Sequence, residues 1–475
     1  MSTADDESAT VQGWVVARSD RGTSNILYGC LIVLFSAVWT LLHLNLPAKG
    51  DSTLTVYMRR LRWGMVSIIA PDFLTLIAAA QWHSAKQNLR RIKELSRSEN
   101  WTMSHVFYAN AGGYLLETTD TDRFPVNASS IHYLVSRGFV ELPSTPHEEI
   151  QDKSNSDALG KGLTLLQCVW FVMQSVARAI EHLPLAPIEL FTLAFIMSTA
   201  MTYYFWWQKP QHVGTATLLR CDVPVSSILM DAGLEPDAAF ENTPFDFIEK
   251  QEERYSRRGT FANFDLERGY PASFYSRREP HDHTTINEKP EHHTAVTGAT
   301  SFFTSTESLP KSQASQASHG TAVASHSRPL RRIPDDAIMP AGLPLKMIGV
   351  LLIPSISHSL IHLLGWNLRF PTQAEQNIWR SAVCTLAGTS FLSVGIVRVL
   401  ARLGYQGRYS LTWVWVTGPK STKGFAIWDV LLSLCTLILV VARLLVIVEV
   451  CISLRELPAK VYVNVSWTNL IPHVA

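Results

Sequence analysis

The chain has 475 residues, of which 47% are hydrophobic, and its formal net charge is +1. This charge balance argues against a nucleic-acid partner, because phosphate recognition needs a basic face. The apolar residues fall in blocks instead of being spread along the chain, so the length does not translate into two or three soluble domains.

The apolar blocks are long enough for membrane spans, which need about 20 apolar residues. Residues 163–180 form a weaker block because they include Gln167, Gln174 and Arg178. We therefore predict an all-α, polytopic integral membrane bundle of about seven spans, with the lipid bilayer as a partner. The six clear candidates are residues 26–46, 61–82, 187–207, 343–364, 382–400 and 427–452.

The polar stretches between these blocks predict the domain boundaries. The first 24 residues are a polar tail, and the span-length block behind them is predicted to stay as an anchor. Residues 211–340 are charged and then rich in Ser, Thr, His and Gln, a composition that cannot bury a core. The predicted units are 1–24 (tail), 25–210 (helices 1–4, with a polar loop at 83–160), 211–340 (largely disordered insert), 341–455 (helices 5–7) and 456–475 (tail).

The first span ends in the sequence WTLLHLNLP, which places Trp39, His43, Asn45 and Pro47 at its far end. Tryptophan is enriched at membrane interfaces, and proline ends a helix, so one interpretation is an interfacial anchor. The other is that His43 and Asn45 line a binding site at that surface.

The second span contains Ala70-Pro71-Asp72 near its middle. Proline cannot donate a backbone hydrogen bond and clashes with the preceding turn, so the sequence predicts a kink here. An acidic residue at membrane depth is a functional candidate. Asp72 is therefore either a catalytic carboxylate or a cap of the restarted helix.

The fourth span begins Pro187-Ile-Glu189. Proline at the first helical position and an acid in the first turn are ordinary helix-start chemistry. Glu189 is also a candidate for a substrate-binding carboxylate. The preceding block carries Gln167, Gln174 and Arg178 on one stripe, which fits either the lining of a polar cavity or a helix in the membrane interface.

The six cysteines include no CxxC pair, which argues against a zinc site or a disulfide framework. Lysine and arginine counts in the loops favour a cytosolic N-terminus and, with seven spans, a lumenal C-terminus. In that arrangement Asn464, in Asn-Val-Ser, is the predicted glycosylation site. The expected location is the endoplasmic reticulum or another endomembrane.

The stretch from Pro354 to Arg380 has the densest polar pattern within the apolar blocks. His358, His362 and Trp366 are spaced by four, so they share one helix face. The helix breaks at residues 370–372, and Glu375, Trp379 and Arg380 follow. One interpretation is a functional site; the other is a re-entrant turn in which Asn367 and Arg380 bond to the backbone.

The sequence shows no phosphate-binding glycine loop, serine nucleophile elbow, haem motif or HExxH. Carboxylates, histidines and indoles in an apolar bundle suit acid-initiated carbocation cyclisation, in which aromatic rings stabilise the positive charge. A non-enzymatic sensor, transporter or scaffold is the alternative. The candidate acids are Asp72, Glu375 and Glu189; the candidate cation stabilisers are Trp366 and Trp379; the polar partners are His362, Asn367, His43, Asn45 and Arg380.

Four motifs carry a resemblance: WTLLHLNLP, APDF, FWWQKP and HLLGWNLRFPTQAEQNIWR. Together they resemble a group of fungal multi-pass membrane proteins and, within it, the membrane-bound terpene cyclases of the ascochlorin/ascofuranone type. The resemblance covers residues 20–215 and 340–455 but not the insert. It implies a cofactor-independent cyclase acting on a hydrophobic, prenylated aromatic substrate in secondary metabolism. The family more often has Glu where this chain has Asp72, which keeps a carboxylate but shortens its reach.

Overall fold

The computed structural model describes residues 10–17, 20–96, 100–153, 158–238, 240, 242–248, 329–335, 345–402 and 427–466. The chain is mostly helical, with two small sheets. The long helices are α1 (Thr23–Leu41), α2 (Thr53–Ile69), α3 (Pro71–Ser96), α7 (Ala158–Ile180), α8 (Pro187–Trp206), α12 (Leu345–Leu364), α13 (Gln373–Arg402) and α15 (Ile427–Ile452). The shorter elements are β1 (Thr10–Gln12), α4 (Met103–Asn110), β2 (Tyr114–Glu117), β3 (Phe124–Val126), α5 (Ala128–Ser136), α6 (His147–Lys153), β4 (Thr217–Arg220), α9 (Val225–Asp231), η1 (Gly365–Asn367), η2 (Ser453–Arg455), β5 (Glu456–Pro458) and η3 (Ala459–Tyr462).

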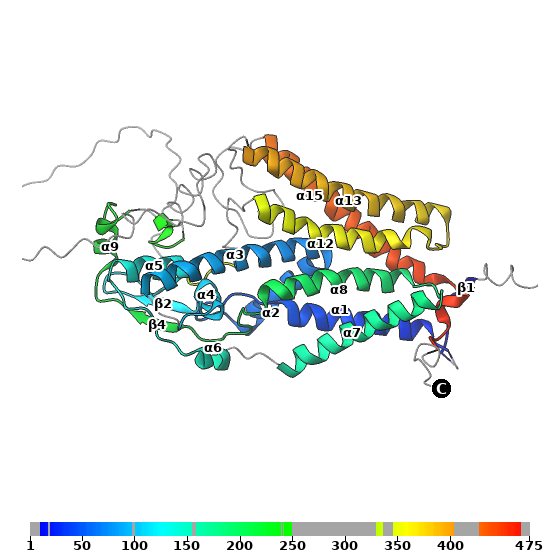
Figure 1. Ribbon diagram of the computed structural model, residues 1–475, viewed down its shortest axis with the longest axis horizontal. Coiled ribbons are helices and arrows are strands. Elements are labelled where there is room, and N and C mark those ends of the chain that lie inside the picture. The colour runs from blue at the N-terminus through cyan, green and yellow to red at the C-terminus, as the bar shows by residue number, and fades with distance from the viewer. Residues whose placement is uncertain are drawn as a thin grey trace, which may run out of the picture.

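Six helices, α1, α7, α8, α12, α13 and α15, run side by side and form a bundle (Figure 1). The central helix α8 packs against α1 and α12, and α13 packs against both α12 and α15. The sequence favours this arrangement because apolar residues dominate each helix. Pro187 opens α8 without losing a backbone hydrogen bond, since the first N–H groups of a helix have no intrahelical partner.

The outer faces of the bundle are apolar. Large hydrophobic side chains are exposed on α1, α7 and α15, for example Phe35, Trp170 and Leu437. Among the described residues, four helices are long and apolar enough to cross a membrane, and a fifth span results if the bent pair α2–α3 is counted as one. The predicted count of seven is therefore not confirmed.

The predicted break at Pro71 is present and is sharper than a kink. Helix α2 ends at Ile69, α3 begins at Pro71, and the two helices are bent by 111°. Ala70 closes α2 by donating to Val66 O and accepts from Phe73 N, so the chain passes directly from one helix into the other. The predicted second span at 61–82 is therefore two helices, and its proline lies at the corner.

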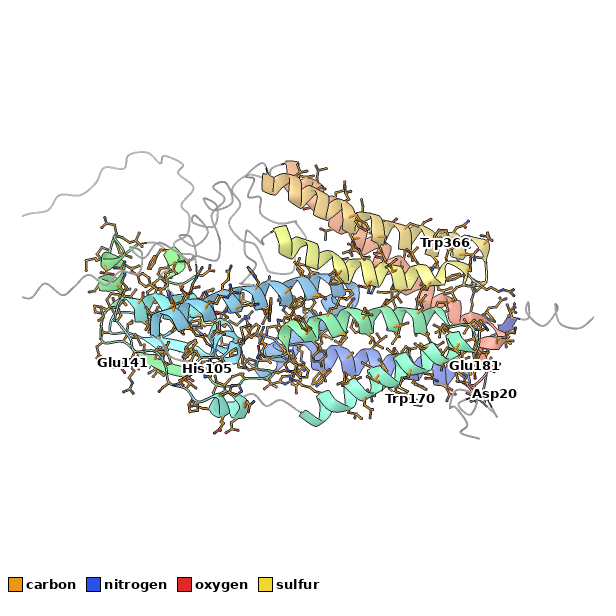
Figure 2. The ribbon with its side chains drawn as sticks, viewed as in Figure 1. Asp20, His105, Glu141, Trp170, Glu181 and Trp366 are labelled. Atoms are coloured by element: carbon orange, nitrogen blue, oxygen red, sulfur yellow. The ribbon has the colours of Figure 1, made fainter. Side chains whose placement is uncertain are left out.

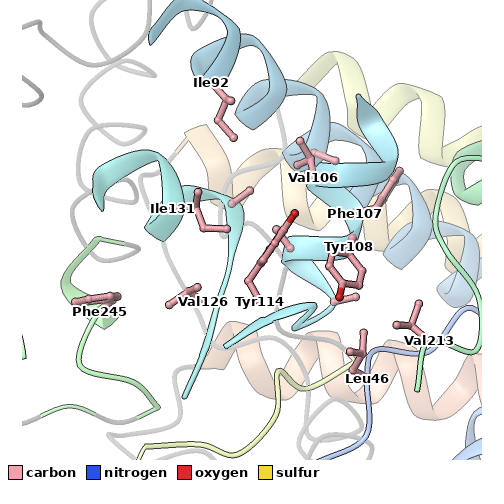
Figure 3. Close-up of a cluster of buried hydrophobic side chains, with 14 of the residues drawn as sticks. Leu46, Ile92, Val106, Phe107, Tyr108, Tyr114, Val126, Ile131, Val213 and Phe245 are labelled. Atoms are coloured by element: carbon pink, nitrogen blue, oxygen red, sulfur yellow. The ribbon is translucent and has the colours of Figure 1, made fainter. Parts of the chain in front are cut away.

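Beyond the bundle, α3 continues into a second unit, which we call the cap (Figure 1). In the cap, β2 pairs antiparallel with β3 and parallel with β4, and α4 and α5 pack on α3. Its core contains Val106, Phe107, Tyr114, Val126 and Ile131 (Figure 3). The cap corrects two predictions. The described residues between 83 and 153 form helices and strands instead of a polar loop. Strand β4 and helix α9 place residues 217–231 in the cap instead of an insert. Residues 249–328 of the predicted insert lie outside the described part of the chain.

At the end of the bundle opposite the cap, β1 pairs antiparallel with β5. Strand β1 precedes α1 and β5 follows α15, so the start of the first bundle helix and the end of the last one lie at the same end of the molecule. Seven spans would place them at opposite ends. The structure therefore corrects the predicted separation of the two termini.

Candidate functional site

A group of polar side chains lies between the bundle helices, and we call it the central cluster: Asp72, Ser198, His358, His362, Trp379 and Arg443. All of them are buried except Asp72, whose side chain is 17% exposed. Arg443, on α15, is 1% exposed and lies at the centre of this group. Its Nη2 is 3.3 Å from Asp72 Oδ2, and its Nη1 contacts His358 Nε2. The α2–α3 corner therefore presents an anion to the bundle, and α15 supplies its counter-ion.

The partners of the two histidines indicate which ring nitrogen carries the proton. His358 Nε2 accepts from Arg443, so Nδ1 is protonated and lies 3.1 Å from Ser198 Oγ and 3.2 Å from Ala194 O. His362 Nδ1 donates to His358 O over 2.9 Å, which leaves Nε2 as a free lone pair. Both rings are thus neutral imidazoles in these contacts.

Aromatic rings enclose the second histidine. The ring centroids of His358 and His362 are 4.6 Å apart, and those of His362 and Trp379 are 5.7 Å apart. Phe191 meets His362 edge-on, and Phe370 lies against Trp379. The cluster therefore joins an ion pair to an aromatic surface through two neutral imidazoles.

Four polar atoms of the cluster are buried without a hydrogen-bond partner among the described residues: Asp72 Oδ1, His362 Nε2, Trp379 Nε1 and Arg443 Nε. Buried polar atoms are normally satisfied, so atoms without a partner mark a place where a ligand or water binds. One of them is a carboxylate oxygen, one is a basic nitrogen and two are N–H donors. Together they can give a proton, accept a proton and hold a polar group.

Glu375, the other predicted acid, lies elsewhere. It is in the first turn of α13, where it bonds to Thr372 and forms an ion pair with Arg455. Four residues further along α13, Trp379 is buried in the central cluster. The structure therefore separates Glu375 from Trp379, which the sequence placed in one site. Asp72 is the carboxylate of the central cluster.

The predicted polar-aromatic stripe stops at His362. Helix α12 ends at Leu364, and Trp366 lies in the η1 turn, 41% exposed, at the end of the bundle away from the cap (Figure 2). Arg380 Nε donates to Trp366 O over 3.0 Å and its guanidinium lies over the Trp366 ring, while Asn367 is exposed. Arg380 and Trp366 thus hold the α12–α13 turn, and no contact of these three residues with the cluster is seen. The backbone-bonding interpretation is confirmed for Arg380.

Glu189 is also structural. Its Oε2 accepts from Ala186 N at the start of α8, and its Oε1 forms a buried ion pair with Arg21. The helix-start interpretation is therefore confirmed. The predicted glycosylation site, Asn464, is exposed behind η3, at the same end of the bundle as β1.

His43 and Asn45 lie at the boundary between the bundle and the cap. Asn45 Nδ2 donates to Pro334 O, and its backbone N–H donates to Asp335 Oδ1. His43 is buried against Trp206. Both residues join the bundle to neighbouring segments at this boundary, and no contact of either residue with the central cluster is seen. Burial lowers the pKa of His43 well below its usual value, so this imidazole is neutral near pH 7.

Arg443 and Ser198 are the members of the central cluster that sequence reasoning did not name as site residues. Arg443 carried a signal, because a lone arginine in an apolar span needs a partner on a neighbouring helix. Ser198 carried none, since a serine in a helix usually bonds to its own backbone. No group of three or more His, Cys, Asp or Glu side chains with metal-binding geometry occurs among the described residues.

The fold and the cluster define a class: a mostly helical protein with several helices able to cross a membrane and an ion pair buried between them. The chain belongs to a family of unknown function, DUF8562, whose sequence profile matches residues 1–232 and 346–474. The matched ranges contain every residue of the central cluster. Neither the curated proteins nor the solved structures gave a match.

Proposed function

We propose that this chain is an integral membrane enzyme, a terpene cyclase that cyclises a linear prenylated aromatic compound or its epoxide. Its apolar outer faces support the placement in a bilayer, since soluble proteins rarely expose large contiguous apolar surfaces. The observation that carries the reaction type is the central cluster, in which a carboxylate, an arginine, two imidazoles and an indole ring follow one another between apolar helices.

The geometry suggests a role for each residue. Asp72, which is ionised in its pair with Arg443, takes up a proton before each turnover. Its Oδ1 then gives this proton to the substrate alkene or epoxide, and Arg443, whose Nη2 is 3.3 Å from Oδ2, stabilises the carboxylate that remains. The Trp379 ring stabilises the carbocation as the ring system forms. His362 Nε2 takes the final proton, so product and substrate have the same mass. Apolar walls exclude the water that would quench the cation early.

The test uses microsomes from yeast that express the chain. A linear farnesylated phenol and its terminal epoxide are supplied, and products are analysed by mass spectrometry. We expect a product of unchanged mass that falls about 100-fold or more in Asp72→Asn, in line with the loss of a general acid. Asp122→Asn, an exposed carboxylate of the cap, is the control at matched protein abundance.

Glu375→Gln separates the two acids that the sequence proposed, because Glu375 lies outside the central cluster and is paired with Arg455. We expect this variant to keep the product. A native protein that is well folded but converts neither substrate would refute the cyclase proposal for this substrate class.

A second candidate is proton-coupled transport or sensing. It is favoured by polar contacts that continue from the cluster toward the cap: Thr75 Oγ1 is 2.8 Å from Thr202 Oγ1 and 3.4 Å from Ser198 O. Further along, Gln81 accepts from Trp206. Proteoliposomes loaded with a pH-sensitive dye test this function. Proton movement in native protein that is lost in Asp72→Asn, with no cyclised product, would replace the enzyme proposal.

A further inference from the structure

The boundary between bundle and cap holds a buried lysine. Lys209, just beyond α8, is 4% exposed, and its Nζ donates to Gln81 Oε1 over 2.9 Å. The same oxygen accepts from Trp206 Nε1, and the ammonium lies 4.8 Å from the centroid of the Trp206 ring. An ammonium group has three N–H donors, so one acceptor leaves two donors unused among the described residues.

A second amine approaches from the other side. Lys161, at the start of α7, lies 3.5 Å from His43 Nε2, while His43 Nδ1 donates to Leu41 O. His43 is therefore a neutral acceptor between two lysines, because Lys209 is also close enough to influence its charge. Lys161 is only partly buried, which leaves this side of the boundary open to an approaching group.

The carboxylates near these two lysines also lie close to arginine side chains. Asp335 Oδ2 is 3.7 Å from Arg59 Nε and 3.6 Å from Arg332 Nη1, and Asp335 also lies near Lys209. Asp51 lies near Arg59 as well. The Arg59 side chain is nine-tenths buried, and its Nη1 has no hydrogen-bond partner among the described residues. Buried cations are normally paired, so this boundary has more positive charge than its own carboxylates balance.

We propose that Lys209 and Lys161 bind the anionic head group of an amphiphile, with its apolar chain in the bilayer or along the bundle, and that His43 positions Lys161 by accepting its hydrogen bond. The occupant is a carboxylate, phenolate or phosphate on a long apolar tail. Gln81 and Asp72 are nine residues apart on α3, so a tail that runs from this head-group site to the central cluster spans about 13 Å. Only this destination of the tail rests on the proposed cyclase function; the head-group site does not.

Protonation of Lys209 supports the geometry. Burial lowers the pKa of Lys209 to about 7, opposed by Asp335. The titratable groups shown near Lys209 are Asp335 and His43, besides its contacts with Gln81 and Trp206. Lys161 and His212 lie near His43. An anion binds the protonated amine, which predominates below pH 7 and is lost above it. Anion binding therefore weakens as the pH rises through 7, while His43 stays neutral throughout.

The test measures binding without turnover. Purified full-length protein in phosphatidylcholine nanodiscs is titrated with a farnesylated hydroxybenzoate and with the farnesylated phenol that lacks only the carboxylate. Tryptophan fluorescence reports occupancy because Trp206 contacts Lys209. We expect the carboxylate to bind at least tenfold more tightly than the phenol at pH 6 and the preference to shrink by pH 8.5. Lys209→Met is expected to abolish the preference.

The chain offers a matched control. Lys86 lies 4.8 Å from the Trp82 ring, the same geometry as Lys209 over Trp206, but Lys86 is exposed. Lys86→Met should keep the preference. Lys161→Met should reduce the preference. This variant replaces Lys209→Met in the test if Lys209→Met does not fold. Equal binding of acid and phenol by native protein, or an unchanged preference in the lysine variants, overturns the proposal.

Two further experiments are needed. The first identifies the source of the anion, and the second tests whether the head-group site is independent of the cyclase function. If nanodiscs of phosphatidylglycerol abolish the preference of the native protein for the acid, the site is confirmed and its occupant is a lipid head group. Asp72→Asn should keep the binding preference even though it is expected to lose turnover. Failure of the cyclase assay alone therefore leaves this site intact, and loss of binding preference in Asp72→Asn contradicts a separate head-group site.

Discussion

At the scale of single residues, the Asp72–Arg443 pair is the feature that organises the bundle. The two side chains come from positions 371 residues apart, and Arg443 is almost completely buried. Taking both charges out of water is costly, and the ion pair offsets that cost only while both partners are present. The pair therefore couples the α2–α3 corner to α15, and its energetic importance is separate from any catalytic role.

This argument predicts the outcome of a double-variant cycle. Arg443→Met alone should destabilise the protein by about 3–5 kcal/mol, because it leaves the Asp72 carboxylate without its cation. Asp72→Leu combined with Arg443→Met should recover most of that loss, since an apolar pair of similar size needs no counter-ion. The measurement is thermal unfolding of purified protein in detergent. A double variant that is less stable than Arg443→Met alone would contradict the ion-pair argument.

At the scale of elements, the sequence predicted the positions of most bundle helices and the break at Pro71. Apolar blocks mark where helices lie, and proline marks where one ends. The 111° bend was not predictable, because proline fixes a break but its direction depends on packing. The partner of Asp72 and the β2–β4 pairing were not predictable either, since both join segments far apart in the sequence. The separation of Glu375 from the cluster was not predictable for the same reason, because its partner Arg455 is also distant in the sequence.

The turn between α12 and α13 gives a prediction at this scale. Gly365 packs so closely that a Cβ atom there would lie 2.6 Å from Leu190 Cδ2, 2.8 Å from Leu368 Cδ1 and 3.3 Å from Trp379 Cζ2. Gly365→Ala should therefore destabilise the protein by about 1–3 kcal/mol through overpacking. The control is Gly388→Ala in α13, where nothing lies within 4 Å. It should be neutral or stabilising by up to about 1 kcal/mol. Thermal unfolding of both variants checks this, and equal stability would show that the turn can expand.

At the scale of the whole molecule, pairing of β1 with β5 constrains how the chain crosses a membrane. Arg178, at the end of α7, donates to Val463 O, and Gly365, after α12, lies against Leu190 at the start of α8. These contacts place the start of α8 and the ends of α7, α12 and α15 at the β1–β5 end of the bundle. The six bundle helices therefore alternate in direction, and the α2–α3 pair enters and leaves on the cap side (Figure 1). We therefore predict an even number of membrane crossings.

An even number of crossings puts both ends of the bundle's chain on one side of the membrane and the cap on the other. Single cysteines at Trp14, Glu148 and Asn464, introduced where the six native cysteines are replaced by serine, test this arrangement in sealed microsomes with a membrane-impermeant maleimide. We expect Trp14→Cys and Asn464→Cys to react from the same side, and Glu148→Cys, in α6 of the cap, from the other. Permeabilised microsomes, in which all three should react, are the control.

Labelling of Trp14→Cys and Asn464→Cys from opposite sides would restore an odd number of spans. If Asn464 carries a glycan, the residue at position 14 must also face the lumen, because the β1–β5 sheet holds the two segments together.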